Sequence, residues 1–244
     1  MTGTAAPSPP PQTLLDTMSN LAAFHREDEE FYSQAPLAQA VEVQAVARVL
    51  RALAGRWSKV APAQHPLPSP YAGAEDLNPP GLVSESGVLF MEGEGEPPEI
   101  SRIKGDLERL AADLDRTASW LSTAMEQAWK VVGSLAEYPV LAELLGERNR
   151  IVANDWQSAG VQRLVVKLLL RSLDLIARVD FSPQGLRSDM ASPRRASAHL
   201  YSASELVDRA ADLLCESAIL VHENERRWRV FEASVRQIRT ASQP

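Results

Sequence analysis

The stretch from Ile100 to Leu135 keeps a seven-residue repeat of apolar and small side chains, and this repeat limits the fold more than any other feature. The steps between its positions alternate three and four without interruption. The positions are Ile100, Ile103, Leu107, Leu110, Leu114, Thr117, Leu121, Ala124, Ala128, Val131 and Leu135. Such spacing places one stripe along an α-helix and favours left-handed supercoiling around a neighbouring helix.

The C-terminal part of the chain carries a second repeat of the same kind. Its positions are Val207, Ala210, Leu214, Ser217, Val221, Asn224, Trp228, Phe231, Val235 and Ile238. Ser202 and Glu205 have the spacing of a capping box, and Tyr201 can pack on Leu206 as a hydrophobic staple. The sequence therefore predicts that the last helix begins at Ser202.

The length of the first repeat has a consequence for the shape of the protein. Residues 98–137 as one helix would span about 60 Å at about 1.5 Å per residue. A compact sphere of 244 residues is only about 45 Å across. With a second helix of similar length, the sequence predicts an all-α protein, an elongated helical bundle of about five helices.

Proline and glycine divide the rest of the chain into segments. Residues 1–12 are expected to be a disordered Pro-rich tail, and residues 13–240 a single helical-bundle domain. Pro36 is expected to open a second helix. The apolar stripe of this helix is expected to contain Val43, Val46, Val49, Leu50, Leu53 and Trp57. Gly146 is expected to end a short helix at 140–145, before a longer helix at 148–178.

Two long irregular loops are predicted, at 58–98 and at 180–201. Residues 58–98 contain 8 of the 17 prolines, so no helix is expected to run through them. Within this segment "GVLFM", from Gly87 to Met91, is the one candidate strand. The second loop is rich in Ser, Pro and Arg, and its "RRAS" (Arg194 to Ser197) resembles a site for a basophilic kinase.

Charge and cysteine content narrow the functional classes. The net charge of −7 argues against a nucleic-acid-binding protein, whose domains are typically basic. The single cysteine, Cys215, excludes a disulfide within the chain and is expected to be a buried, inert thiol. No apolar run approaches the roughly 20 residues that a membrane helix needs, so we expect no membrane insertion and a cytoplasmic protein.

The stretch "NDWQSAGVQ", from Asn154 to Gln162, partly resembles a magnesium-diphosphate site. Asn154 and Ser158 have the right spacing, but the third position is Gln162, which cannot supply the anionic ligand that a hard cation prefers. The sequence therefore favours a buried helix with an internal hydrogen-bond site. No histidine is preceded by Glu three residues earlier, so the ligand pattern of a di-iron bundle is lacking, and no metal or cofactor is expected.

Some polar residues remain as candidates for a site between the first, fourth and last helices. They are His25, Asn154, Asp155, His222 and Asn224. Ser217 and Asn224 also interrupt the apolar repeat of the last helix. A polar residue on such a stripe commonly determines register or partner choice. Alternatively, the stripe is only half buried at these positions.

Charge is distributed unevenly along the chain. Residues 84–99 contain five glutamates and no Lys or Arg, whereas the last helix is rich in arginine. Both regions could simply be solvated surfaces. The functional hypothesis is a protein-binding surface made of Val88, Leu89, Phe90, Met91, Arg226, Arg227 and Arg229.

These observations favour a non-enzymatic helical interaction or scaffold protein, a subunit of a homo- or hetero-oligomeric assembly. The heptad stripes carry this hypothesis, together with the lack of a recognisable catalytic motif. The alternative is a helical-bundle enzyme or small-molecule-binding protein that uses the polar residues just named. A regulator controlled by phosphorylation or by a ligand is a third hypothesis.

Overall fold

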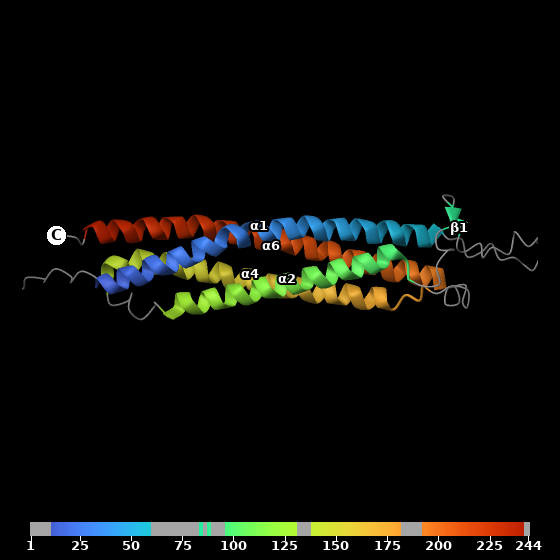
Figure 1. Ribbon diagram of the computed structural model, residues 1–244, viewed down its shortest axis with the longest axis horizontal. Helices are drawn as coiled ribbons and strands as arrows, with labels where there is room; N and C mark the ends of the chain where they lie inside the picture. Colours follow the sequence, from blue (N-terminus) through green and yellow to red (C-terminus); the bar gives the residue numbers. More distant parts are fainter. Residues whose placement is uncertain are drawn as a thin grey trace, which may run out of the picture. The chain divides into compact units, whose positions relative to one another are not determined.

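The computed structural model describes the backbone of residues 11–59, 83–84, 87–88, 96–130, 138–181 and 192–241. Within these ranges the description omits the side chains of residues 21–35, 56–59, 83–84, 87–88, 124, 127–130, 140 and 192–194. In chain order the elements are α1 (Gln12–Lys59), β1 (Val83–Ser84), β2 (Gly87–Val88), α2 (Pro98–Lys130), the 3₁₀ helix η3 (Pro139–Leu141), α4 (Ala142–Ala177) and α6 (Ser192–Ala241) (Figure 1). The predicted all-α class is confirmed, since β1 and β2 form only a two-residue antiparallel pair.

The chain divides into two compact units, and each unit takes part of every α-helix. Unit 1 contains Met1–Gln39, Leu114–Leu164 and Leu213–Pro244. Unit 2 contains Ala40–Asp113 and Val165–Asp212.

Both heptad stripes are buried, as the sequence predicts, at the positions whose side chains the structure describes. Four predicted positions of the first stripe lie outside this description: Ala124, Ala128, Val131 and Leu135. In α2 every stripe position from Ile100 to Leu121 is buried, Thr117 included. In α6 every stripe position from Val207 to Val235 is buried, and Ile238 is half buried. Because the polar members Ser217 and Asn224 are buried with the rest, half burial does not explain their place on the stripe.

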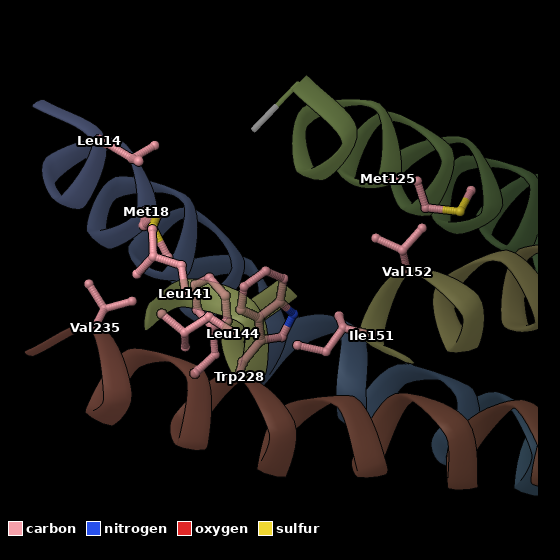
Figure 2. Packing of buried hydrophobic residues seen from close by; sticks show 10 residues of the cluster. Leu14, Met18, Met125, Leu141, Leu144, Ile151, Val152, Trp228 and Val235 are labelled. Carbon is pink, nitrogen blue, oxygen red and sulfur yellow. The ribbon is translucent and has the colours of Figure 1, made fainter. Parts of the chain in front are cut away.

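The core of unit 1 is an apolar cluster to which all its helices contribute. Its buried members are Leu14, Met18, Met125, Leu141, Leu144, Ile151, Val152, Trp228, Phe231 and Val235. Figure 2 shows side chains of α1, η3, α4 and α6 converging around the Trp228 ring. Trp228 and Phe231 make an edge-to-face contact with ring centroids 5.3 Å apart, an arrangement that aromatic pairs prefer.

Unit 2 combines a buried apolar interior with polar links between its helices. Arg109 Nη2 of α2 donates to Glu42 Oε2 of α1 over 2.6 Å. Ser172 Oγ of α4 donates to the Ala203 carbonyl of α6 over 3.3 Å. The expected stripe of α1 is confirmed at Val43, Val46, Leu50 and Leu53 but is wrong at Val49, which is 44% exposed. Val49 lies one residue before Leu50, about 100° around the helix from it.

The helix break expected at Pro36 is wrong, because α1 continues through this residue. Proline removes one backbone hydrogen bond and costs about 3 kcal/mol in a helix interior. Pro36 is itself buried, so packing of the surrounding helix offsets this local cost. The end expected at Gly146 is also wrong, since α4 runs from Ala142 through this exposed glycine at a cost of only about 1 kcal/mol.

The predicted start of the last helix is also wrong, because α6 begins at Ser192. The predicted loop at 180–201 is thus helical from 192 onward. Tyr201 is 50% exposed and does not act as a staple. The extra turns bury Ala196 and Leu200 in unit 2, which explains why the helix extends beyond the local capping signal.

Candidate functional site

Polar side chains of α4 and α6 meet inside unit 1 and form what we call the polar cluster. Its members are Asn154, Asp155, Ser158, Gln162, Ser217 and Asn224. Asp155, Ser158 and Gln162 are spaced by three and four positions and therefore lie on one face of α4, and Asn154 is at the edge of this face, next to Asp155. The two α6 residues are seven positions apart on the buried heptad stripe.

Asn224 is at the centre of one half of the polar cluster. Its Nδ2 donates to Asp155 Oδ1 over 2.6 Å and to the Ile151 carbonyl over 3.0 Å. Its Oδ1 accepts a hydrogen bond from Asn154 Nδ2 over 2.9 Å. The Asn224 amide thus uses both its donors and its acceptor, and it joins α6 to three residues of α4.

Asp155 is the titratable group of this cluster. Its side chain is buried, and the loss of solvation raises its pKa to about 7, although the hydrogen bond from Asn224 lowers the pKa in part. A carboxyl group with this pKa is divided between its protonated and ionised forms near neutral pH. Chemically, the group can take up and release a proton inside the helical pair.

The other half of the polar cluster is formed by hydroxyl and amide groups. The Oγ atoms of Ser158 and Ser217 are 2.7 Å apart, and Gln162 Nε2 donates to Ser217 Oγ over 3.2 Å. Gln162 Oε1 is buried and has no hydrogen-bond partner among the described residues. An unsatisfied buried acceptor costs about 1–3 kcal/mol.

Replacing Gln162 with Met is expected to leave the free energy of unfolding unchanged or to raise it by about 1 kcal/mol, because the change removes that buried acceptor at similar volume. Ser217→Ala should instead lower it by about 1–3 kcal/mol, since Ser158 and Gln162 lose a partner. Urea denaturation measures both. Equal destabilisation by the two changes would show that Gln162 Oε1 has a partner, such as a buried water molecule.

The structure brings together only some residues of the candidate polar site. Asn154, Asp155 and Asn224 are in contact. The His222 side chain is 82% exposed and lies 3.4 Å from the Glu225 carboxylate, away from the cluster. The His25 side chain lies outside the described residues.

The arginines of the hypothetical partner-binding surface differ in their surroundings. Arg227 Nη1 donates to Glu147 Oε1 of α4 over 2.9 Å, and Arg227 also binds Glu223. These carboxylates raise the pKa of Arg227. Arg229 binds Glu225, while Arg226 is exposed.

Most of the other half of that hypothetical surface lies outside the described part of the chain. The backbone of Val88 belongs to β2, and Leu89, Phe90 and Met91 lie outside the described residues. The partner-binding role of the whole surface stays a prediction. Of the "RRAS" motif, Ser197 is half buried in α6, and its Oγ donates to the Ala54 carbonyl over 2.8 Å.

A groove of about 550 Å³ lies between α4 and α6 in unit 1. It is lined by Glu143, Leu144, Gly146, Glu147, Arg150, Val230, Phe231, Ser234, Gln237 and Ile238. The polar cluster is not part of its lining. Sequence reasoning missed this groove, because its lining comes from two helices whose alignment the sequence does not give.

An exposed apolar face on α4 is the second feature that sequence reasoning missed. Its members are Ala153, Trp156, Gly160 and Leu164, which we call the Trp156 face. The side chains of Trp156 and Leu164 are 71% and 47% exposed. The signal was present in the sequence, since the spacing of three, four and four places these residues beside the buried stripe of the same helix.

Comparison with known proteins does not add a functional assignment. No family model, curated protein or solved structure matches this sequence. The polar cluster, the groove and the Trp156 face therefore carry the functional inference.

Metal binding and membrane insertion are considered for the described part of the chain alone. Among them, no group of three or more His, Cys, Asp or Glu side chains could hold a metal ion. None of the helices, as far as they are described, is both long and apolar enough to cross a membrane.

Proposed function

We propose that the chain is a non-enzymatic helical interaction or scaffold protein that binds a protein partner or a second copy of itself. The observation that carries this proposal is the Trp156 face. Tryptophan is a residue type that often dominates binding energy at interfaces, where it is buried by the partner. A tryptophan exposed to water on 71% of its surface leaves that energy available.

The distribution of charge along α4 supports the same proposal. Between Arg150 and Arg163 the only charged residue is Asp155, and its side chain is buried. The exposed surface of this part of α4 is therefore uncharged over about three turns. Depletion of charge around an aromatic side chain is typical of the centre of a protein interface.

The polar cluster supports the proposal because it holds in place the helix that carries the Trp156 face. Its hydrogen bonds hold Asn154, Asp155 and Ser158 against α6. Since α4 is held in this way on its buried side, the Trp156 face is presented on a rigid element. A preorganised surface loses less conformational entropy when it binds a partner.

Binding of a small molecule is a second candidate function, and the groove between α4 and α6 favours it. A volume of about 550 Å³ lies within the usual range of ligand sites. Its lining combines apolar groups, such as Val230, with polar groups, such as Glu143 and Gln237. The ligand would be a compact molecule with an apolar part and hydrogen-bonding groups.

Photo-cross-linking in cells that produce the protein tests the main proposal. A cross-linking amino acid at position 156 is expected to give a covalent protein adduct. The matched control is position 126, where Glu126 is exposed on α2 of the same unit. Adducts at neither position, or equally at both, would contradict a specific interface at Trp156.

The same protein, purified and analysed by native mass spectrometry, separates the two candidate functions. Mass added in units of a polypeptide supports the interaction protein. A small, constant mass above 26.7 kDa that is lost when Gly146 is replaced with Trp would instead support a ligand in the groove.

A further inference from the structure

The Trp156 face contains a protruding side chain and an open space one helical turn apart. Trp156 projects into solvent, and Gly160 follows four residues later on the same side of α4. A Cβ atom built on Gly160 would meet no atom within 4 Å apart from the adjoining residues and the backbone of its own helix. The face therefore offers both a projection and a site where another backbone or side chain can approach the helix closely.

We propose that the occupant of this face is a second copy of the same chain, packed in an antiparallel manner across a two-fold axis. This inference rests on the proposed interaction function and names its partner. The two-fold axis passes the exposed side of α4 at the level of residue 158, midway between Trp156 and Gly160. Trp156 of each copy then lies over Gly160 of the other. In such an isologous contact one surface supplies both complementary parts, and the Trp156 face contains both.

Charge selects the antiparallel arrangement over the parallel one. A parallel pair in register would place Arg150 against Arg150 and Arg163 against Arg163, and like charges in contact oppose association. In the antiparallel pair Arg163 instead lies beside the small, uncharged Ala153 of the other copy. The uncharged exposed surface between Arg150 and Arg163 of one copy then faces the same surface of the other copy.

The small area of the Trp156 face places this association among weak interfaces. A buried tryptophan contributes about 150–250 Å², and only a few smaller residues surround it on each copy. The contact thus belongs below about 1,200 Å² in total, the range of weak and transient interfaces. The dimer is expected to dissociate on dilution within the micromolar range.

Sedimentation equilibrium of the full chain over a dilution series tests the proposal. The wild-type protein should show a reversible monomer–dimer equilibrium. Trp156→Ala should weaken it by about tenfold or more, as truncation of a central aromatic residue does. Gly160→Gln should weaken it as much, because the added side chain fills the space that Trp156 of the other copy occupies.

The glycine substitution also separates an interface effect from a folding defect. Gly160→Gln should leave the melting temperature unchanged or raise it, because Gln is the better helix former and meets open space. Gly105→Gln is the matched control, since Gly105 is exposed on a different helix, α2, and an added Cβ there also meets no neighbouring atom within 4 Å. The control should have the same thermal effect and an unchanged dimer.

Engineered cysteines test the orientation. In a Cys215→Ala background, a mixture of the Ala153→Cys and Arg163→Cys variants should form a disulfide-linked dimer on mild oxidation, more readily than either variant alone. Dimers formed mainly by Ala153→Cys alone would overturn the antiparallel arrangement.

The remaining outcomes are also decisive. A wild-type protein that stays monomeric at all concentrations overturns self-association, as does a dimer that Gly160→Gln leaves intact. In either case a cross-link from position 156 to a different protein would leave the proposed interaction function standing and refute only the choice of partner.

Discussion

Replacing Leu114 with Ala is expected to lower the free energy of unfolding by about 2–5 kcal/mol. Leu114 is fully buried in the middle of the α2 stripe, so the change removes apolar contacts and leaves a cavity. Chemical denaturation monitored by circular dichroism gives the value directly.

The adjacent Asp113 provides the control for this substitution. Its carboxylate is 28% exposed and lies 3.7 Å from Arg109, a partly solvated ion pair. Pairs of this kind contribute about 0–1 kcal/mol, so Asp113→Ala should have a small effect. Similar losses in the two variants would mean that the α2 stripe is not the buried face of the helix.

Replacing Asp155 with Asn is expected to raise stability at high pH and to remove a pH dependence that the wild-type protein shows. The pKa of Asp155 is about 7 in the folded protein, above its ordinary value of 3.8. Between these values the folded chain retains a proton that the unfolded chain releases. The contribution of Asp155 to the free energy of unfolding is therefore fully present below pH 3.8, and it is lost as the pH rises to about 7.

The size of this effect follows from the difference between the two pKa values. From pH 5 to pH 8.5 the free energy of unfolding of the wild-type protein should fall by about 2–3 kcal/mol relative to that of Asp155→Asn, since one pKa unit corresponds to about 1.4 kcal/mol. Urea denaturation at the two pH values measures the loss. Asp212→Asn, at an exposed position of α6, is the control and should follow the wild-type profile. A constant difference between wild type and Asp155→Asn would show that the Asp155 carboxyl is ionised throughout.

The long helices could be predicted from the sequence because the spacing of apolar residues along one segment is enough to reveal the helical period. The stripes of α2 and α6 are buried position by position from Ile100 to Leu121 and from Val207 to Val235. Helix ends were less predictable. Pro36, Gly146 and Ser202 carry local signals for helix boundaries, but the tertiary packing of the longer helices outweighs these signals.

The candidate site was predictable only in part for a related reason. Asn224 and Asp155 stood out because they are polar residues in helices with buried apolar faces. Their contact could not be derived, since it depends on how α4 and α6 are aligned. The groove is formed by what neighbouring helices leave unfilled, and a single stretch of sequence does not contain that information.

The polar cluster also affects how the chain reaches its native state. Helices with regular seven-residue repeats have competing alignments that differ by a whole repeat and bury almost the same apolar surface. Sliding α6 by seven residues in one direction would place Phe231 against Asp155, and in the other direction would place Ala210 against Gln162. Either misalignment leaves buried polar groups without partners, at about 1–3 kcal/mol each. The few hydrogen bonds of Ser217 and Asn224 thus make misaligned kinetic traps shallow, and a chain that enters one can escape and refold.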